Sequence, residues 1–109
     1  MKIFDDLIQS YLFTKLDDRT VDAWYQRYAP DDEALSALAE HIGDCFLAEQ
    51  LNFDAANGLL NHLMVLASYE TAPKRFWEYF IAFEDYQVSD NPDSDARPAV
   101  AALKTGGAA

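Results

Sequence analysis

DDEALSALAEHIGDCFLAEQ, residues 31–50, is the most regularly patterned stretch of this 109-residue chain. Its apolar side chains recur three or four positions apart, which places them on one side of a helix. They are Leu35, Leu38, Ile42, Cys45 and Phe46. Glu33, Glu40 and Asp44 fall within about 40° of one another on the opposite side. The stretch therefore predicts a helix with an apolar inner face and an acidic outer face.

The same spacing rule predicts four further helices, at about 3–16, 20–29, 54–68 and 71–86. The segment 54–68 is apolar nearly all round, which is typical of a central, buried helix. No segment shows the alternation of apolar and polar residues that marks a half-buried strand. Short connections of roughly 3 to 5 residues favour antiparallel neighbours. We therefore expect an all-α, compact bundle of about five helices.

The length of the chain fits one domain. We predict that residues 1–88 form the helical bundle domain. From Val88 onward, Asp, Pro, Ser and Gly dominate, and these residues are typical of turns and loops. We therefore expect an irregular C-terminal loop and tail at 89–109, with room for one short helix at 98–104.

The charge of the chain is strongly negative and unevenly distributed. Nineteen acidic residues against eight basic ones give a net charge of −11. Between residues 31 and 70 there are eight acids and no Lys or Arg. A soluble helix usually mixes Glu with Lys four residues on, because such pairs stabilise it. A charge of this sign argues against nucleic acid or an anionic membrane as a partner and favours a basic protein.

We predict that the carboxylates of this acidic segment bind the partner. The candidate partner-binding residues are Asp31, Asp32, Glu33, Glu40 and Asp44, with Glu49 and Trp77 as weaker candidates. Trp77 is included because it lies off the main apolar stripe of its helix and Trp is common in binding hot spots. The prediction requires these carboxylates to be gathered on one surface and not used in bonds within the molecule.

A metal or catalytic site is a weaker interpretation. His41 and Cys45 are four residues apart on one helix, and His62 could supply a third ligand. Structural zinc sites usually carry paired Cys or His at both ends, and here only one end is present. Acids around Cys45 disfavour the thiolate that nucleophilic catalysis needs. We therefore expect no enzyme activity, no catalytic residue, no metal and no cofactor.

Two functional hypotheses remain open. The first is a small, acidic, cytoplasmic protein-binding module that neutralises or caps a basic partner protein, such as a toxin or a nucleic-acid-binding protein. Immunity proteins, antitoxins and nucleic-acid mimics have this general character, and a monomer is expected. The alternative is a structural or adaptor helical domain, including a homodimer formed through apolar contacts of Trp77, Ile81 or Phe13. The cytoplasm is expected because acids stand where a signal peptide would carry its apolar stretch.

Overall fold

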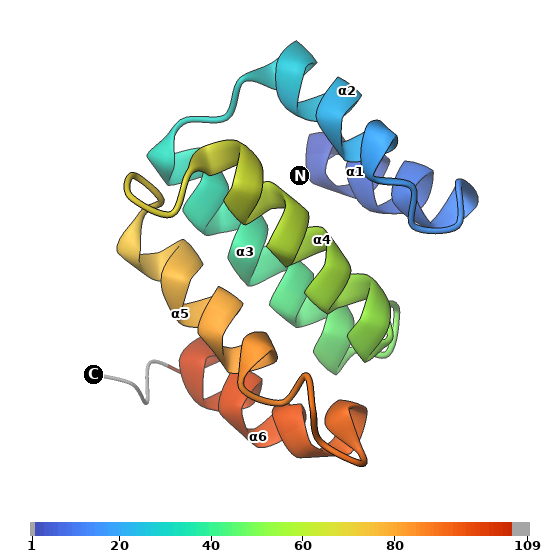
Figure 1. Cartoon of the computed structure of the whole chain (residues 1–109), viewed down its shortest axis with the longest axis vertical. Coiled ribbons are helices and arrows are strands. Elements are labelled where there is room, and N and C mark those ends of the chain that lie inside the picture. The colour runs from blue at the N-terminus through green and yellow to red at the C-terminus, as the bar shows by residue number, and fades with distance from the viewer. Residues whose placement is uncertain (1, 106–109) are drawn as a thin grey trace.

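The computed structural model describes residues 2–105, which form six α-helices and no strand (Figure 1). The helices are α1 (Lys2–Phe13), α2 (Asp18–Tyr28), α3 (Asp32–Leu47), α4 (Phe53–Ala67), α5 (Lys74–Glu84) and α6 (Pro92–Lys104). The predicted all-α bundle is confirmed, and α1 to α5 correspond to the five predicted helices.

The α1–α2 hairpin lies on one side of the central helices α3, α4 and α5, and α6 lies on the other (Figure 1). Within the hairpin, α1 packs against α2, and α2 packs against α4. At the other side α6 packs against both α3 and α5. The central helices run antiparallel in sequence order, so the α3–α4 and α5–α6 connections lie at the same end of the bundle.

Three phenylalanine rings pack together at the end of the core where α3 and α5 end and α4 begins. The ring of Phe46 lies 4.9 Å from that of Phe83 and 6.5 Å from that of Phe53. All three side chains are buried, because each helix turns its apolar stripe inward. The expectation that the helix at 54–68 is buried is only partly met, since Val65 on α4 is 60% exposed.

Helix ends differ from the predicted ends because of the capping residues. Asp17 caps α2 by accepting a hydrogen bond from the Arg19 amide, so this helix begins at Asp18 and not at about residue 20. Asn52 caps α4, which begins at Phe53. Helices commonly end on a left-handed glycine, but here other residues take that conformation. Positive φ angles occur at Lys15, Leu16, Ala29, Glu49 and Ser68.

The structure corrects the extent of the last helix. The helix expected over 98–104 starts instead at Pro92, so residues 92–97 are helical and not loop. Pro92 suits a first helical turn, and the apolar spacing of Ala96, Val100 and Leu103 buries one face of α6. Pro98 is tolerated inside the helix, where the residue four positions earlier, Ser94, is exposed to water. The remainder of the expected tail, residues 106–109, lies outside the described residues.

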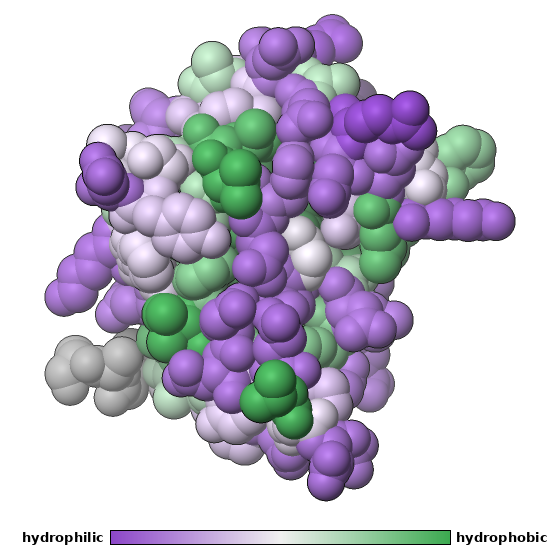
Figure 2. All heavy atoms as spheres, viewed as in Figure 1, coloured by the Kyte–Doolittle hydropathy of each residue, from purple (hydrophilic) through white to green (hydrophobic). Residues whose placement is uncertain are grey.

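Hydrophilic residues cover most of the face seen in Figure 2, and the apolar side chains on it form separate spots. Such single apolar groups are ordinary on a protein surface. Across residues 2–105, no helix combines the length and the apolar character needed to cross a membrane.

Candidate functional site

The acidic outer face of α3 is paired with basic residues of α5 and α6. Arg75 on α5 holds Glu40, with Nε 2.8 Å from Oε1. Lys104 at the end of α6 lies 3.3 Å from an Asp44 carboxylate oxygen. These contacts explain why α3 lacks the usual lysine four residues after its glutamates: the neutralising charges come from other helices. The predicted free acidic face is therefore corrected, because its middle is used in bonds within the molecule.

The other predicted acidic residues lie at the two ends of α3. Asp31 caps the helix by accepting a hydrogen bond from the Ala34 amide at 2.8 Å. Asp32 and Glu33 are exposed in the first turn, where the helix dipole favours acids. Glu49 lies beyond the last turn, roughly 24 Å away for a helix of this length. The seven predicted residues are thus not brought together on one surface.

Trp77 belongs to an aromatic group at the junction of α4 and α5. Its ring lies 5.8 Å from Tyr69 and 5.5 Å from Phe80. Trp77 is partly buried, but Tyr69 is 51% exposed and Ile81, one turn further along α5, is 42% exposed. Phe13 is 89% exposed, but it lies on α1, in the α1–α2 hairpin, and not beside Trp77. We call Tyr69, Trp77 and Ile81 the aromatic patch.

Both histidines are engaged by aspartates, and the cysteine is buried. His41 Nε2 lies 2.7 Å from Asp5, and His62 Nε2 lies 2.6 Å from Asp22. Burial and the nearby Asp5 carboxylate raise the pKa of the Cys45 thiol, which disfavours thiolate chemistry. Among the residues that the structure describes, no three or more His, Cys, Asp or Glu side chains are placed to hold a metal ion.

Arg75 joins three helices. Besides Glu40 it reaches Glu78 on its own helix at 3.2 Å, and its Nη2 donates to the Leu103 carbonyl at 2.7 Å near the end of α6. Its guanidinium also lies over the Tyr79 ring, 5.1 Å from the centroid. A planar group with several donors is suited to such a junction, and an ammonium group is not.

We predict that Arg75→Gln lowers the free energy of unfolding by about 1–2 kcal/mol, because a carboxylate and a helix-end carbonyl lose their donor. Arg75→Lys should recover less than half of the loss. Urea unfolding measures both values. The exposed neighbour variant Lys74→Gln is the control and should change stability by less than about 0.5 kcal/mol. A lysine variant as stable as the wild type would contradict this role for the guanidinium.

Most of the net negative charge lies instead at one end of the bundle. The α3–α4 connection and the start of α4 meet the α5–α6 connection there. The Phe53 amide donates to Asp93 at 3.1 Å, and Asn57 donates to Gln87 at 3.4 Å. Residues 48–57 and 84–97 together carry seven carboxylates and one basic residue, Arg97, a net of −6. We call this region the acidic end; its carboxylates are Glu49, Asp54, Glu84, Asp85, Asp90, Asp93 and Asp95.

Arg97 neutralises only a small part of the acidic end. Its guanidinium lies 3.3 Å from Asp93 and 3.7 Å from Glu49, and it also donates to the Leu47 carbonyl at 3.1 Å. Asp54, Asp85 and Asp90 are exposed. One further side chain, Glu84, has a buried carboxylate oxygen that lacks a hydrogen-bond partner in the described part of the chain. The acidic end therefore retains free negative charge on its exposed carboxylates.

Sequence patterns do not reveal the acidic end, because its two segments are separated by α4 and most of α5. The available signal is the cluster of Asp90, Asp93 and Asp95 near the C-terminus. In the sequence, however, the same cluster is typical of a loop and tail. Val88 in the same connection is 91% exposed, which adds an apolar group among these acids.

An open hollow of about 670 Å³ lies on the outside of the α1–α2 hairpin. Trp24 and Tyr28 line it together with Arg19 and Arg27. Hydrogen bonds from Arg19 lower the pKa of Asp17, so this guanidinium is already matched by a carboxylate. Among the described residues Arg27 is not in an ion pair, but Asp6 also lines the hollow, so the hollow offers little net positive charge to an anionic ligand.

Comparison of the chain with models of protein families, with curated proteins and with solved structures gives no match.

Proposed function

We propose that this protein is a small, non-catalytic, cytoplasmic binding domain that caps a basic partner protein through its acidic end. The partner carries a lysine- and arginine-rich surface, as a toxin or a nucleic-acid-binding protein does. Immunity proteins, antitoxins and nucleic-acid mimics act in this general way.

One observation carries the proposal: the acidic end contains seven carboxylates and a single basic residue, Arg97. A surface of this sign speeds the encounter with a basic partner and selects against acidic ones. The exposed Val88 supports it, because it offers an apolar contact to the partner. The net charge of −11 acts in the same direction over longer range.

The test compares two triple variants that carry the same net charge. The first is Asp54→Asn, Asp85→Asn and Asp90→Asn at the acidic end. The immobilised variant and wild type are exposed to cell lysate, and bound basic proteins are eluted with a salt gradient. We expect the wild type to retain a basic protein and this variant to bind it at least about tenfold more weakly, since each exposed charge contributes a few tenths to 1 kcal/mol.

The matched control is Asp32→Asn, Glu33→Gln and Glu70→Gln, which removes three exposed carboxylates elsewhere. Affinity for the same protein should stay within about threefold of wild type, because long-range steering contributes little once the surface contacts are kept. Equal weakening in both variants would assign binding to overall charge. If the control variant bound more weakly than the first variant, the binding site would instead lie at the start of α3.

A second candidate function is self-association through the aromatic patch, favoured by the exposure of Tyr69 and Ile81 beside Trp77. Sedimentation at two protein concentrations distinguishes it. A binding domain for a basic partner remains monomeric at both concentrations, because two copies of charge −11 repel each other. A concentration-dependent dimer that Trp77→Ala abolishes would support the second candidate.

A further inference from the structure

Helices α3, α4 and α5 each pack against the other two, so this group has three outer sides, one for each pair of helices. The α1–α2 hairpin covers the α3–α4 side: α2 packs against α4, and Asp5 on α1 lies 2.7 Å from His41 on α3. Helix α6 packs against both α3 and α5 and covers that side. Within residues 2–105, no helix packs from outside against α4 and α5 together (Figure 1). We call this third side the open face.

Uncovered apolar surface is concentrated on the open face and at its acidic end. The described chain exposes seven large apolar side chains, and four of them lie on α4, on α5 or directly after these helices. These four are Val65, Tyr69, Ile81 and Val88. The partly buried Trp77 lies among them, with its ring 5.8 Å from that of Tyr69. The open face is therefore apolar where the other two sides of the group are already packed.

Two contacts fix how α4 and α5 lie along each other. At one end of the open face Tyr69, just after α4, meets Trp77 near the start of α5. At the other end the Asn57 side chain donates to Gln87 at 3.4 Å. The two helices therefore run antiparallel over the full length of the open face.

Along this length the open face changes from apolar to acidic. Val65 and Ile81 lie one turn inward from the Tyr69–Trp77 contact, so they are opposite each other on α4 and α5. The exposed Asp85 follows two turns after Trp77, roughly 12 Å along the helix. At that point the open face joins the acidic end.

We propose that the open face binds an amphipathic helix of the partner protein, apolar where it meets Val65 and the aromatic patch and rich in Lys and Arg where it reaches the acidic end. This inference rests on the proposed function, because it names the element through which the basic partner binds. An amphipathic helix presents one apolar group every three or four residues, about one per turn. The apolar side chains of the open face are spaced by turns in the same way. The partner helix packs on α4 and α5 as α6 packs on α3 and α5.

Charge selects this occupant over a second copy of the chain. A second copy brings a net charge of −11 to a face that ends in free carboxylates, and the two copies repel each other. A basic amphipathic helix gains from burial of the exposed apolar side chains and from attraction to these carboxylates. Both parts of the open face are then used by one ligand.

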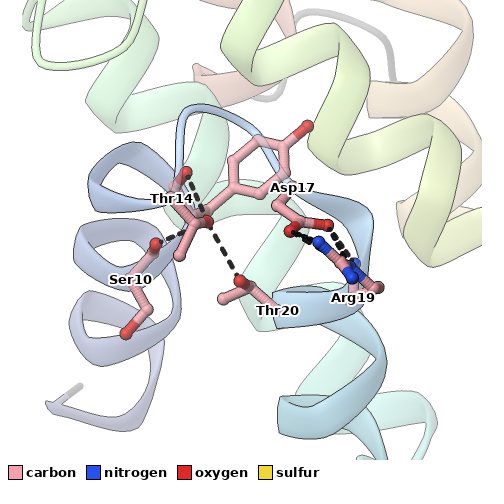
Figure 3. A network of polar contacts seen from close by, with 6 residues as sticks. Ser10, Thr14, Asp17, Arg19 and Thr20 are labelled. Atoms are coloured by element: carbon pink, nitrogen blue, oxygen red, sulfur yellow. Dashed lines mark hydrogen bonds and ion pairs between the residues drawn. The ribbon is translucent and has the colours of Figure 1, made fainter.

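The hairpin provides a matched control surface. Leu12 and Phe13 are exposed apolar side chains at the end of α1, which is not part of the open face. Figure 3 shows the turn that follows them, where the Thr14 and Thr20 hydroxyls are 2.9 Å apart and Arg19 holds Asp17 at 2.9 Å. Polar groups of this turn are thus paired with one another.

The probes are two synthetic peptides of about 15 residues, the length of α4. The first places leucines three and four positions apart on one side and lysines toward one end. The second has the same residues in scrambled order, so it carries the same charge without the apolar stripe. We expect the ¹⁵N-labelled protein to bind the first peptide at least about tenfold more tightly. The first peptide should shift the amides of 65–69 and 77–81 as well as the acidic end, and the second only the acidic end.

Val65→Ser/Ile81→Ser should weaken binding of the first peptide about tenfold and leave the second unchanged, because two apolar contacts are lost and no charge is. The control Leu12→Ser/Phe13→Ser should leave both affinities within about twofold of wild type. Equal affinities of the wild type for the two peptides, or equal effects of the two double variants, would overturn the open face as a docking site, whereas shifts at the acidic end would still support the proposed function. If neither peptide shifted the acidic end, the proposed function itself would fail. A dimer in sedimentation that Val65→Ser/Ile81→Ser abolishes would assign the face to a second copy and contradict the proposal.

Discussion

Phe83→Ala is expected to lower the free energy of unfolding by about 3–5 kcal/mol. Phe83 is fully buried, and its ring meets Phe46 at 4.9 Å and Phe53 at 5.7 Å. Removing it takes one ring from the point where α3, α4 and α5 pack together, and the helix backbones cannot close the space. Urea unfolding monitored by circular dichroism measures the loss as a lower midpoint.

Two further variants make this prediction specific. Phe13→Ala removes the same side chain where it is 89% exposed, and stability should change by less than about 0.5 kcal/mol. Phe83→Leu keeps much of the volume and remains measurable if the alanine variant does not fold; it should lose about 1–2 kcal/mol. Equal losses for Phe83→Ala and Phe13→Ala would contradict the position of the core.

The second large effect is expected at Gly43 in the middle of α3. A Cβ atom added there would lie 2.5 Å from Tyr79 Cε1 and 3.3 Å from Val100 Cγ1. These contacts come from α5 and α6, so Gly43 lies where α3 packs closely against both of these helices. Gly43→Val should lower the free energy of unfolding by about 3 kcal/mol, at the upper end of the usual cost of overpacking.

Helix propensity alone makes the opposite prediction, because alanine and valine both favour a helix interior over glycine. The series Gly43, Gly43→Ala, Gly43→Val should therefore lose stability stepwise in urea unfolding. Gly58→Ala on α4 is the comparison: its added Cβ meets only the Tyr11 hydroxyl at 2.8 Å, the end of a side chain. A stability gain for Gly43→Ala as large as propensity predicts, about 1 kcal/mol, would exclude the close packing.

The fold could be predicted from sequence because the apolar spacing of each long helix is set by its own residues. The two-faced pattern at 31–50 corresponds to α3, and Gly43 within it lies at a close packing contact. The helix ends were less predictable, since Ala29, Glu49 and Ser68 have positive φ angles although none of them is glycine. The start of α6 was missed because Pro92 and the following Asp and Ser residues also suit a turn.

For the candidate site, the sequence predicts only that its charge is negative. Local spacing correctly places Glu40 and Asp44 on the outer face of α3, but their partners Arg75 and Lys104 are 35 and 60 residues further along the chain. No local pattern encodes such pairs. The acidic end also depends on contacts between distant parts of the chain, because residues 48–57 and 84–97 meet only after α4 and α5 pack side by side.

The most direct test of the account is a titration of the ¹⁵N-labelled protein with an oligo-lysine peptide, followed by amide chemical shifts. The peptide is a minimal substitute for a basic partner, and its binding follows the unneutralised charge. We predict that the largest shifts occur at residues 48–57 and 84–97, that those at 31–44 are small, and that both decrease as salt is added. Largest shifts along α3, or equal shifts over the whole surface, would contradict the claim that the α5 and α6 bases neutralise α3 and leave the acidic end free.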